Sequence, residues 1–208
     1  NYVNNRFILG GTYSFYYIRD PSTMYSRFYI FESVNGLNWT RHTYEFSYPK
    51  KTATTSAIFN MNQIVYHNGK YVLVGSRGGI YTSTNLDNWK RITISNMDKA
   101  LTDIVYQRGK YVVVGYDGTI LTSSDGDKWE KQDSTTTQTL RRLGFGNGMF
   151  IAGGYNGAIL QSYDGISWVN ISDRNGTKWS MVYNNLNDTM VILGSWFTNT
   201  HTIPLYLL

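Results

Sequence analysis

Hydrophobic and polar residues alternate along most of this chain in short runs that turn residues interrupt. One stretch shows the pattern well, with alternating runs at residues 104–107, 110–115, 119–123 and 129–132. Alternation with a period of two is typical of β-strands that bury one face. The pairs Arg108-Gly109, Asp117-Gly118 and Asp125-Gly126 separate the runs, and glycine permits the positive φ that tight hairpins require. The stretch therefore predicts four short antiparallel strands.

This four-strand pattern recurs along the chain with a period close to 40 residues. Three copies share an aromatic residue, a polar turn, an apolar run and a glycine in the same order, at residues 66–75, 106–115 and 145–154. Fainter copies lie at residues 2–11 and 183–194. Four antiparallel strands per repeat, repeated radially, make a β-propeller blade. The sequence predicts an all-β fold, a propeller of about five four-stranded blades. A parallel β-helix is the alternative, although its coils of about 20 residues match the period less well.

A second motif begins eight residues after the glycine in three of these copies and ends on tryptophan. Its four copies are Ser33–Trp39, Ser83–Trp89, Ser123–Trp129 and Ser162–Trp168. Two copies carry Asp-Gly at their centre, as Asp125-Gly126 and Asp164-Gly165. The spacing Ser-x-Asp-Gly-x-x-Trp resembles the Asp-box, or BNR, repeat of sialidase-like propellers. The resemblance implies a hairpin between the third and fourth strands of each blade.

The residue types of this motif suit a folding role. An Asp or Asn oxygen can accept backbone N–H bonds across its own turn, glycine takes the left-handed position, and tryptophan buries apolar area between neighbouring sheets. Asn35 and Asn85 replace the Asp in the first two copies, and Leu86 stands where glycine is expected. We therefore expect these two turns to be looser than the others. A calcium loop at residues 125–127 is the alternative, but the segment lacks the spaced ligands and the final Glu of an EF-hand.

Composition narrows the class of protein. The 208 residues include 16% aromatic and 16% charged residues and no cysteine, which excludes a disordered chain, disulfides and a thiol nucleophile. The length suits one domain spanning residues 1–208. Because the chain starts at Asn1 and the repeats open and close in mid-blade, we expect a segment of a longer chain. No apolar run reaches the length of a membrane span, and the net charge of +5 is too dispersed to favour nucleic acid as a partner.

The first repeat departs from the others through two insertions. Gly11 and Ser33 are 22 positions apart, against eight for Gly75 and Ser83. The segment after Trp39 is longer too, and both insertions are rich in Tyr and Phe. Connections in propellers vary freely, and binding residues concentrate on such loops. We expect both insertions to be loops on one face, with packing of their aromatic rings on each other as the alternative.

The same face should carry the turns between second and third strands and the starts of the innermost strands. Aromatic rings beside Arg, Asn and Asp suit a sugar, because the rings stack on its C–H faces while polar groups bind its hydroxyls. Arginine also pairs with phosphate or carboxylate oxygens. The candidate ligand-binding residues are Tyr13, Tyr16, Tyr17, Arg19, Tyr44, Arg77, Tyr116, Asp117, Arg141, Arg142, Tyr155, Asn156, Trp179 and Trp196. As structural alternatives, Arg141 and Arg142 line a central channel, and Trp179 and Trp196 pack between sheets.

Candidate catalytic residues are few. Of the three Glu, only Glu45, in the second insertion, is well placed, since Glu32 and Glu130 adjoin the Ser-to-Trp motifs on the other face. Ordinary glycosidases need a carboxylate pair, and sialidases replace the nucleophile with Tyr. The three histidines lack metal-ligand spacing. We therefore predict no catalytic residue, no metal and no cofactor, and we keep a sialidase-like glycoside hydrolase as an alternative.

A Cys-free propeller of about five blades, rich in Asn and Tyr, resembles the platform modules in receptor-binding proteins of phages that infect Gram-positive bacteria. The resemblance implies a non-enzymatic adhesion module that binds carbohydrate, either a glycan or an anionic cell-wall polymer such as teichoic acid. It also implies an extracellular location, at a cell surface or on the tail of a virion, within a larger oligomeric assembly. The chain is similar as well to the photosystem assembly-factor propellers, which implies a protein–protein interaction scaffold as the other alternative.

Overall fold

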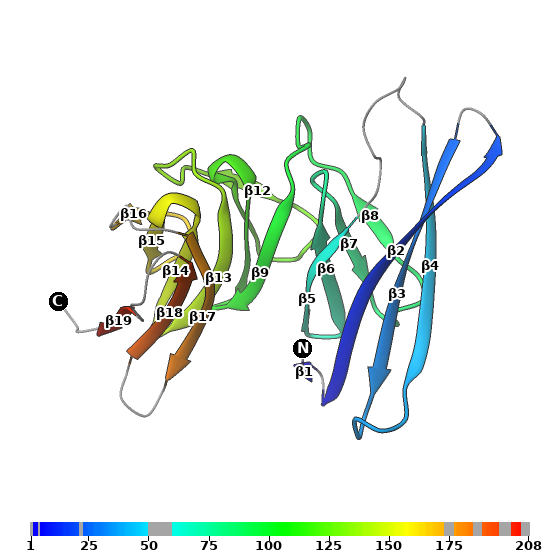
Figure 1. The fold of residues 1–208 in the computed structure, drawn as a ribbon, viewed down its shortest axis with the longest axis horizontal. Coiled ribbons are helices and arrows are strands. Elements are labelled where there is room, and N and C mark those ends of the chain that lie inside the picture. The colour runs from blue at the N-terminus through cyan, green and yellow to red at the C-terminus, as the bar shows by residue number, and fades with distance from the viewer. Residues whose placement is uncertain are drawn as a thin grey trace. The chain divides into compact units, whose positions relative to one another are not determined.

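A computed structural model describes residues 2–3, 5–20, 23–49, 60–172, 177–184, 189–195 and 201–204. Most of these residues lie in β-strands, and the helical segments among them are two single 3₁₀ turns, η1 (Tyr116–Gly118) and η2 (Tyr155–Gly157). In the part of the chain that is described, the strands form five antiparallel sheets, four with four strands and the last with three. Within each sheet the strands follow chain order, so every sheet is a meander (Figure 1).

The strands have the following bounds. Sheet 1 contains β1 (Tyr2–Val3), β2 (Arg6–Asp20), β3 (Thr23–Ser33) and β4 (Thr40–Pro49). Sheet 2 contains β5 (Met61–His67), β6 (Lys70–Gly75), β7 (Ile80–Ser83) and β8 (Lys90–Ile92). Sheet 3 contains β9 (Leu101–Gln107), β10 (Lys110–Gly115), β11 (Ile120–Ser123) and β12 (Glu130–Gln132). Sheet 4 contains β13 (Leu140–Gly146), β14 (Met149–Gly154), β15 (Ile159–Ser162) and β16 (Val169–Asn170). Sheet 5 contains β17 (Thr177–Asn184), β18 (Thr189–Ser195) and β19 (His201–Pro204).

The chain divides into two compact units, which we describe separately. Unit 1 (Asn1–Asp98) holds sheets 1 and 2. Unit 2 (Lys99–Leu208) holds sheets 3, 4 and 5. The organisation of residues 1–208 as one domain, cut from a longer chain, stays a prediction.

The alternating runs form strands where the pattern predicts them. In sheet 3, β10, β11 and β12 match the predicted runs to within one residue, and β9 begins three residues earlier than expected. Tyr106 and Tyr111 lie opposite each other across the β9–β10 hairpin, with ring centroids 4.6 Å apart. Cross-strand aromatic pairs of this kind stabilise a hairpin. The aromatic residue at the start of this regular repeat therefore stabilises the hairpin of its own sheet.

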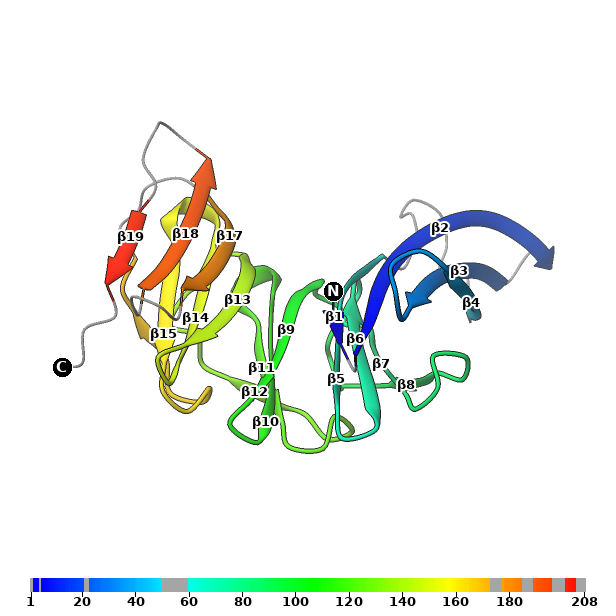
Figure 2. The same cartoon turned by 90° about the horizontal axis from the view of Figure 1, so that it is seen from below.

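Sheet 1 corrects the expectation that the two insertions are loops. β2 is 15 residues long, β3 is 11 and β4 is 10, and the three run on together beyond the short β1 (Figures 1 and 2). Tyr13 pairs with Arg27 across β2 and β3, and Ser26 pairs with Phe46 across β3 and β4. Both insertions thus belong to one three-stranded extension of the sheet. Pairing satisfies backbone groups that a long loop would leave to water, and Tyr and Phe favour strands.

In unit 1 the apolar core lies between sheets 1 and 2. Ile8, Phe28 and Ile30 project from sheet 1 toward Tyr81 and Trp89 of sheet 2. The rings of Phe28 and Trp89 meet edge to face at a centroid distance of 5.7 Å. Edge-to-face contact is a favoured geometry for aromatic pairs and adds to the stabilisation from buried area.

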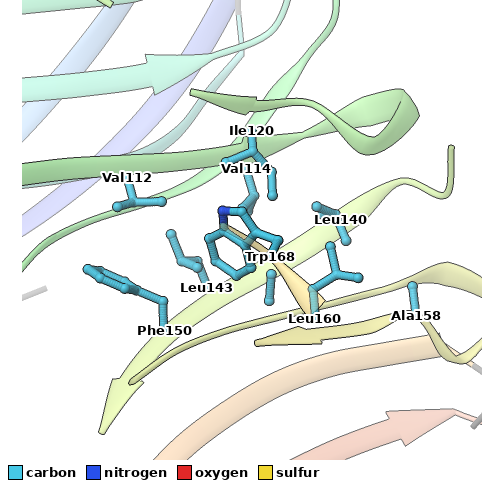
Figure 3. Close-up of a cluster of buried hydrophobic side chains, with 10 residues drawn as sticks. Val112, Val114, Ile120, Leu140, Leu143, Phe150, Ala158, Leu160 and Trp168 are labelled. Carbon is cyan, nitrogen blue, oxygen red and sulfur yellow. The ribbon is translucent and has the colours of Figure 1, made fainter. Parts of the chain in front are cut away.

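In unit 2 an equivalent core lies between sheets 3 and 4. Figure 3 shows Trp168 with its indole ring between residues of the two sheets, among them Val114 and Leu160. Val112, Ile120 and Phe150 belong to the same buried cluster. Buried apolar area of this kind is the main source of favourable free energy in folding.

The four motifs from Ser to Trp, hereafter the Ser–Trp turns (residues 33–39, 83–89, 123–129 and 162–168), share one set of hydrogen bonds. In the last turn, the Gly165 N–H donates to Ser162 Oγ at 2.8 Å, and the Ser167 N–H donates to Asp164 Oδ1 at 2.8 Å. The Trp168 indole N–H donates to the Gly165 carbonyl at 3.1 Å. The other three turns repeat these bonds.

The two turns that we expected to be looser, with Asn in place of Asp, keep the whole set of bonds and differ only in slightly longer bonds to the Asn oxygen. Asn35 and Asn85 accept backbone N–H bonds at 2.9–3.1 Å, whereas Asp125 and Asp164 accept them at 2.8 Å. A neutral amide oxygen is a weaker acceptor than a carboxylate, which accounts for the longer distances. Leu86 takes a φ of +65°, and its side chain is buried in the unit 1 core, which offsets the cost of that backbone conformation.

Candidate ligand-binding rim

The second-to-third turns of sheets 3 and 4 have the same backbone. In η1, Asp117 and Gly118 have φ values of 54° and 67°, and the Thr119 N–H donates to the Tyr116 carbonyl at 3.0 Å. In η2, Asn156 and Gly157 have φ values of 51° and 71°, and an equivalent bond closes the turn. Two successive left-handed residues make a tight hairpin turn, and Asp and Asn tolerate that conformation better than most residues.

Neighbouring backbone holds both turns in place. A Cβ atom on Gly118 would lie 1.9 Å from the Thr136 carbonyl oxygen, so this position has no space for any other residue. The Gly118 N–H donates to the Gln138 carbonyl at 2.9 Å, which links the η1 turn of sheet 3 to the segment that enters sheet 4. The Tyr155 N–H donates to the Thr139 carbonyl at 2.9 Å. The turn backbones are therefore fixed, and their side chains are free to differ.

We define the rim as seven residues at this edge of unit 2, where η1 and η2 lie at the same end of sheets 3 and 4 (Figure 1). They are Lys99, Tyr116, Asp117, Gln138, Arg141, Tyr155 and Asn156. Five of them are among the ligand-binding residues that the sequence predicts, whereas Lys99 and Gln138 are not. Both stand two residues before an inner strand, so the repeat itself carried the signal that would have found them.

Three polar pairs organise the rim. The Arg141 guanidinium donates from Nη1 to Tyr155 Oη at 3.2 Å, and its Cζ lies 5.5 Å from the centroid of that ring. The Asn156 side-chain amide donates to Gln138 Oε1 at 2.7 Å. Lys99 Nζ lies 2.7 Å from Asp117 Oδ2. The rim therefore combines a cation stacked on an aromatic ring, an amide pair and an ion pair on one linked backbone.

Other predicted site residues lie elsewhere. Arg142 is exposed and donates from Nη1 to the Arg141 carbonyl at 3.0 Å. Arg77 belongs to unit 1, where it occupies the same turn position as Asp117 with a φ of 58°. Tyr44 packs against Phe28 with centroids 5.2 Å apart and donates its hydroxyl to the Trp89 carbonyl, which gives it a structural role in unit 1.

The remaining predicted residues have no described side chain. The backbones of Tyr13, Tyr16, Tyr17 and Arg19 lie in β2, and that of Trp179 lies in β17. Their side chains, and the whole of Trp196, lie outside the described residues. Their ligand-binding role stays a prediction.

Two carboxylates that could be considered for a catalytic role, those of Glu45 and Asp103, already accept hydrogen bonds from other groups of the protein. Glu45 Oε2 accepts a bond from Arg27 Nε at 2.6 Å. The buried carboxylate of Asp103 accepts the N–H of Ile104 on one oxygen and the N–H of Leu143 on the other, both at 2.9 Å. Among the described residues, no group of three His, Asp or Glu side chains could hold a metal ion, and no helix is long and apolar enough to cross a membrane.

Comparison with known proteins identifies the fold. The chain matches no protein-family model and no curated protein sequence. Virginiamycin B lyase from Staphylococcus aureus, in its inactive H270A form with quinupristin, is similar in structure, with 12% identity, a TM-score of 0.64 and coverage of 91% of this chain and 68% of that chain. The WD40 β-propeller domain of Doa1 is similar over 84% of this chain and 59% of its own, with 11% identity and a TM-score of 0.52.

This chain has a β-propeller fold. The predicted fold class, all-β with four-stranded blades, is confirmed, and the five sheets of the described residues agree with the predicted number of blades. The propeller YCF48 bound to a D1 peptide is also similar, with 16% identity and a TM-score of 0.53. The match covers 82% of this chain and 57% of the YCF48 chain. At these identities the likeness concerns the fold alone.

Proposed function

We propose that this propeller is a non-enzymatic module that binds carbohydrate, either a glycan or an anionic cell-wall polymer, through the rim of unit 2. The Arg141–Tyr155 pair carries the proposal. Its phenol ring offers a flat surface for the C–H face of a sugar, and its guanidinium offers donors to phosphate or carboxylate oxygens. A glycan that carries phosphate, such as a teichoic acid, presents both kinds of group in one repeat.

The neighbouring pairs supply complementary hydrogen-bonding groups. The amides of Asn156 and Gln138 offer both donors and acceptors beside the stacked ring. Tyr116 is 40% exposed, so a second aromatic side chain is accessible on the rim. Asp117 and Lys99 add one group of each charge. Sugar hydroxyls both donate and accept hydrogen bonds, and this mixture of groups suits them.

The fixed backbone of the rim favours binding. The turns are held by bonds to Gln138 and Thr139, and Gly118 leaves no space for rearrangement. A site held in its binding geometry loses little conformational entropy when a ligand arrives. Side chains of different chemistry at equivalent turn positions, such as Asp117 and Asn156, allow one scaffold to match an uneven ligand.

The carboxylates argue for binding over catalysis. A retaining glycosidase needs two carboxyl groups about 5.5 Å apart, and the rim holds one, Asp117, which pairs with Lys99. Glu45 forms an ion pair with Arg27, and both carboxylate oxygens of Asp103 accept hydrogen bonds from backbone N–H groups. We therefore propose no turnover for this site.

The hydrogen bonds of the Ser–Trp turns support their assignment as Asp-boxes, because each residue type has the folding role that the motif requires. An adhesion module at a cell surface or on a phage tail, in a larger assembly, is the setting that we propose for such a site. Binding to intact cell walls is the property that this setting demands.

The experiment is binding of the purified chain to Gram-positive cell walls, before and after removal of teichoic acid. We expect binding that falls when the polymer is removed, and we expect Arg141→Ala or Tyr155→Ala to weaken it by about tenfold, the loss typical of one charge-assisted bond. Arg108→Ala is the matched control. Arg108 lies in the first-to-second turn of sheet 3 and donates from Nη1 to the Gly148 carbonyl, at the opposite edge. Equal binding by all variants would remove the rim from the proposal.

A second candidate function is binding of a peptide segment of a partner protein. The likeness in fold to YCF48 bound to a D1 peptide favours it. Arginine, tyrosine and asparagine on the rim also suit a peptide backbone and an acidic side chain. A peptide array read out beside the cell-wall assay separates the two functions. Peptide hits that Arg141→Ala abolishes, together with no cell-wall binding, would select this candidate.

A further inference from the structure

The outer strand of sheet 1 is much longer than the outer strands of the regular sheets. β4 has 10 residues, whereas β8 and β12 have three each and β16 has two. In the described part of the chain, β4 is the last strand of its sheet and pairs with β3 (Figure 1). Exposed edge strands are usually short, because a long row of backbone N–H and C=O groups pairs readily with another chain. Sheet 1 therefore has an edge long enough to accept a further strand.

β4 lacks most of the features that protect such an edge. Its register with β3 is regular over the whole strand, whereas the register of β2 with β3 shifts twice. The strand contains no lysine, and its one proline, Pro49, is its last residue. Bulges, lysines and prolines are the usual means by which natural sheets prevent edge-to-edge pairing. The backbone of residues 40–48 is therefore suited to pairing.

One face of β4 packs on sheet 2 and holds the strand in position. Tyr44 donates its hydroxyl to the Trp89 carbonyl at 3.0 Å, and His42 Nδ1 lies 2.7 Å from Asp87 Oδ1. Side chains of a strand stand roughly perpendicular to the sheet, so these contacts do not use the edge of the strand. A strand that is already fixed loses little conformational entropy when a second strand pairs with it.

The opposite face of β4 carries one charge of each sign, placed symmetrically about Thr43. Alternation puts Arg41, Thr43 and Glu45 on this face, and the first two are exposed. The Arg41 Cζ lies over the Tyr29 ring, 5.7 Å from its centroid, and a guanidinium in this position keeps its N–H donors in its own plane. Glu45 Oε2 accepts a bond from Arg27 Nε at 2.6 Å, and a carboxylate can accept bonds from more than one arginine.

Antiparallel pairing of two copies about Thr43 makes these charges complementary. In this register Arg41 of each copy lies opposite Glu45 of the other, so the two-fold axis produces the same contact twice. Directly opposed side chains have Cβ atoms about 5 Å apart, within reach of an ion pair. Each Glu45 then lies between Arg27 of its own chain and Arg41 of the other copy. Moving the two-fold centre by one residue in either direction separates the opposite charges.

We propose that this edge of unit 1 binds a second copy of the chain, by antiparallel pairing of residues 40–46 with the same residues of the other copy. Backbone groups alone accept any strand, whereas the charges at positions 41 and 45 favour a strand of this same sequence. Seven paired residues on each side make an interface at the small end of the usual range, so we expect a dimer that dissociates on dilution. The inference is independent of the proposed rim, which belongs to unit 2.

Charge exchange tests the proposed register. Arg41→Glu opposes two carboxylates at each contact, and Glu45→Arg opposes two guanidinium groups, so each variant alone should dimerise at least about tenfold more weakly. An equimolar mixture of the two variants restores opposite charges at both contacts and should associate as the wild type does. Arg91→Glu, at an exposed position of β8, is the matched control and should leave the association unchanged.

Analytical ultracentrifugation over a dilution series measures the association, and circular dichroism checks that each variant is folded. The expected result is a wild-type dimer, two variants that are monomeric alone, and a dimer in their mixture. A wild type that is monomeric at every concentration would overturn the proposal. So would a mixture of folded variants that associates no better than either variant alone.

Cross-linking gives a second test that leaves the charges unchanged. The chain has no cysteine, so Thr43→Cys introduces a single thiol. In the proposed register, position 43 lies opposite itself with Cα atoms about 4.5–5.5 Å apart, a distance that a disulfide bridges. Thr40→Cys is the control: it is also exposed on β4, but position 40 lies opposite position 46, which separates the two thiols by about 20 Å.

With oxidised glutathione we expect a disulfide-linked dimer from Thr43→Cys and none from Thr40→Cys. Non-reducing gel electrophoresis measures both. Equal cross-linking of the two variants, or of neither, would contradict pairing about Thr43.

Discussion

In unit 1 and in unit 2, two neighbouring sheets pack through buried apolar residues at corresponding positions of the repeat. The polar contacts between the sheets differ between the two units. Ile8 and Ile30 of sheet 1 correspond to Val112 and Ile120 of sheet 3 in the repeat, and all four are buried. On the facing sheets, the two equivalent tryptophans, at positions 89 and 168, are each 6% exposed. The repeat therefore assigns the same positions to the core in both units.

The polar contacts between neighbouring sheets come from an inner strand in unit 2 and from an outer strand in unit 1. In unit 2 they come from the inner strand β9: the Asp103 carboxylate accepts the Leu143 N–H, and the Thr102 hydroxyl donates to the Leu140 carbonyl at 2.6 Å. In unit 1 they come from the outer strand β4, through His42 and Tyr44. A repeat thus constrains apolar positions closely and leaves the polar contacts between sheets to each blade.

The elongation of sheet 1 explains part of this difference. Phe28 occupies the repeat position of Gly118, which in sheet 3 is a turn residue. Because β2 and β3 continue as strands, no turn is needed there, and an aromatic ring can enter the core. Phe28 meets Tyr44 and Trp89, whereas the core of unit 2 holds the small residues Ala152 and Ala158.

The largest test of the shared packing is removal of the tryptophans. Trp168→Ala and Trp89→Ala should each lower the free energy of unfolding by about 3–5 kcal/mol, because a large buried ring leaves a cavity. Trp39→Ala should cost less than about 1 kcal/mol, since Trp39 is 38% exposed. Urea denaturation followed by circular dichroism measures all three. Similar losses for Trp39 and Trp168 would show that burial at these positions does not set the stability of the contact.

Removing the hydrogen bonds of Asp103 between sheets 3 and 4 should lower the free energy of unfolding by a smaller amount. Asp103→Ala leaves the buried N–H groups of Ile104 and Leu143 without this acceptor and should lower the free energy of unfolding by about 2–3 kcal/mol. Gln63, in sheet 2 of unit 1, has the same place in the repeat as Asp103, but it accepts the Ile64 N–H within its own strand. Gln63→Ala should therefore cost about 1 kcal/mol. Urea titrations that rank the two variants in the opposite order would break the comparison.

The smallest effect concerns acid and the Ser–Trp turns. Backbone bonds from Ile166 and Ser167 lower the pKa of Asp164 from 3.8 to about 2. A depressed pKa stabilises the folded state above the ordinary value, and this contribution is lost as pH falls from about 4 toward 2. The equivalent turn of unit 1 carries Asn85, which does not titrate. Amide exchange, corrected for its intrinsic pH dependence, should lose protection at Ser167 and not at Asn88, and Asp164→Asn should abolish the loss.

The periodicity predicted much of the architecture. Strand bounds in sheet 3, the hairpin turns and the burial of Trp89 and Trp168 follow from alternation, glycine and spacing. The prediction that the two insertions are loops is wrong, because short turns in the regular blades give no information about strands that continue past the turn position. Tyr13 and Phe46 lie in paired strands because the second insertion provides a partner for the first, and no local pattern reveals that pairing.

The residues of the candidate site are likewise predicted in part from the sequence, whereas the contacts between them depend on the tertiary structure. Arg141, Tyr155 and Asn156 were found from their place in the repeat, but the stacking of Arg141 on Tyr155 depends on the distance between an inner strand and a turn in space. The sequence predicts Tyr44 as a ligand-binding residue because its aromatic ring lies in an insertion. The structure shows that ring packed on Phe28, because elongation of β4 carries it over the core of unit 1.

By itself, the sequence determined the repeat, the strands, the turn chemistry and the apolar positions, since these depend on short-range alternation and on the φ preferences of glycine, Asp and Asn. The tertiary structure alone decided which polar groups meet across neighbouring sheets. Asp87 is 45 residues from His42, and Leu143 is 40 residues from Asp103. Contacts over such separations arise only when sheets pack, because packing sets the distance at which a charge or an N–H group finds its partner.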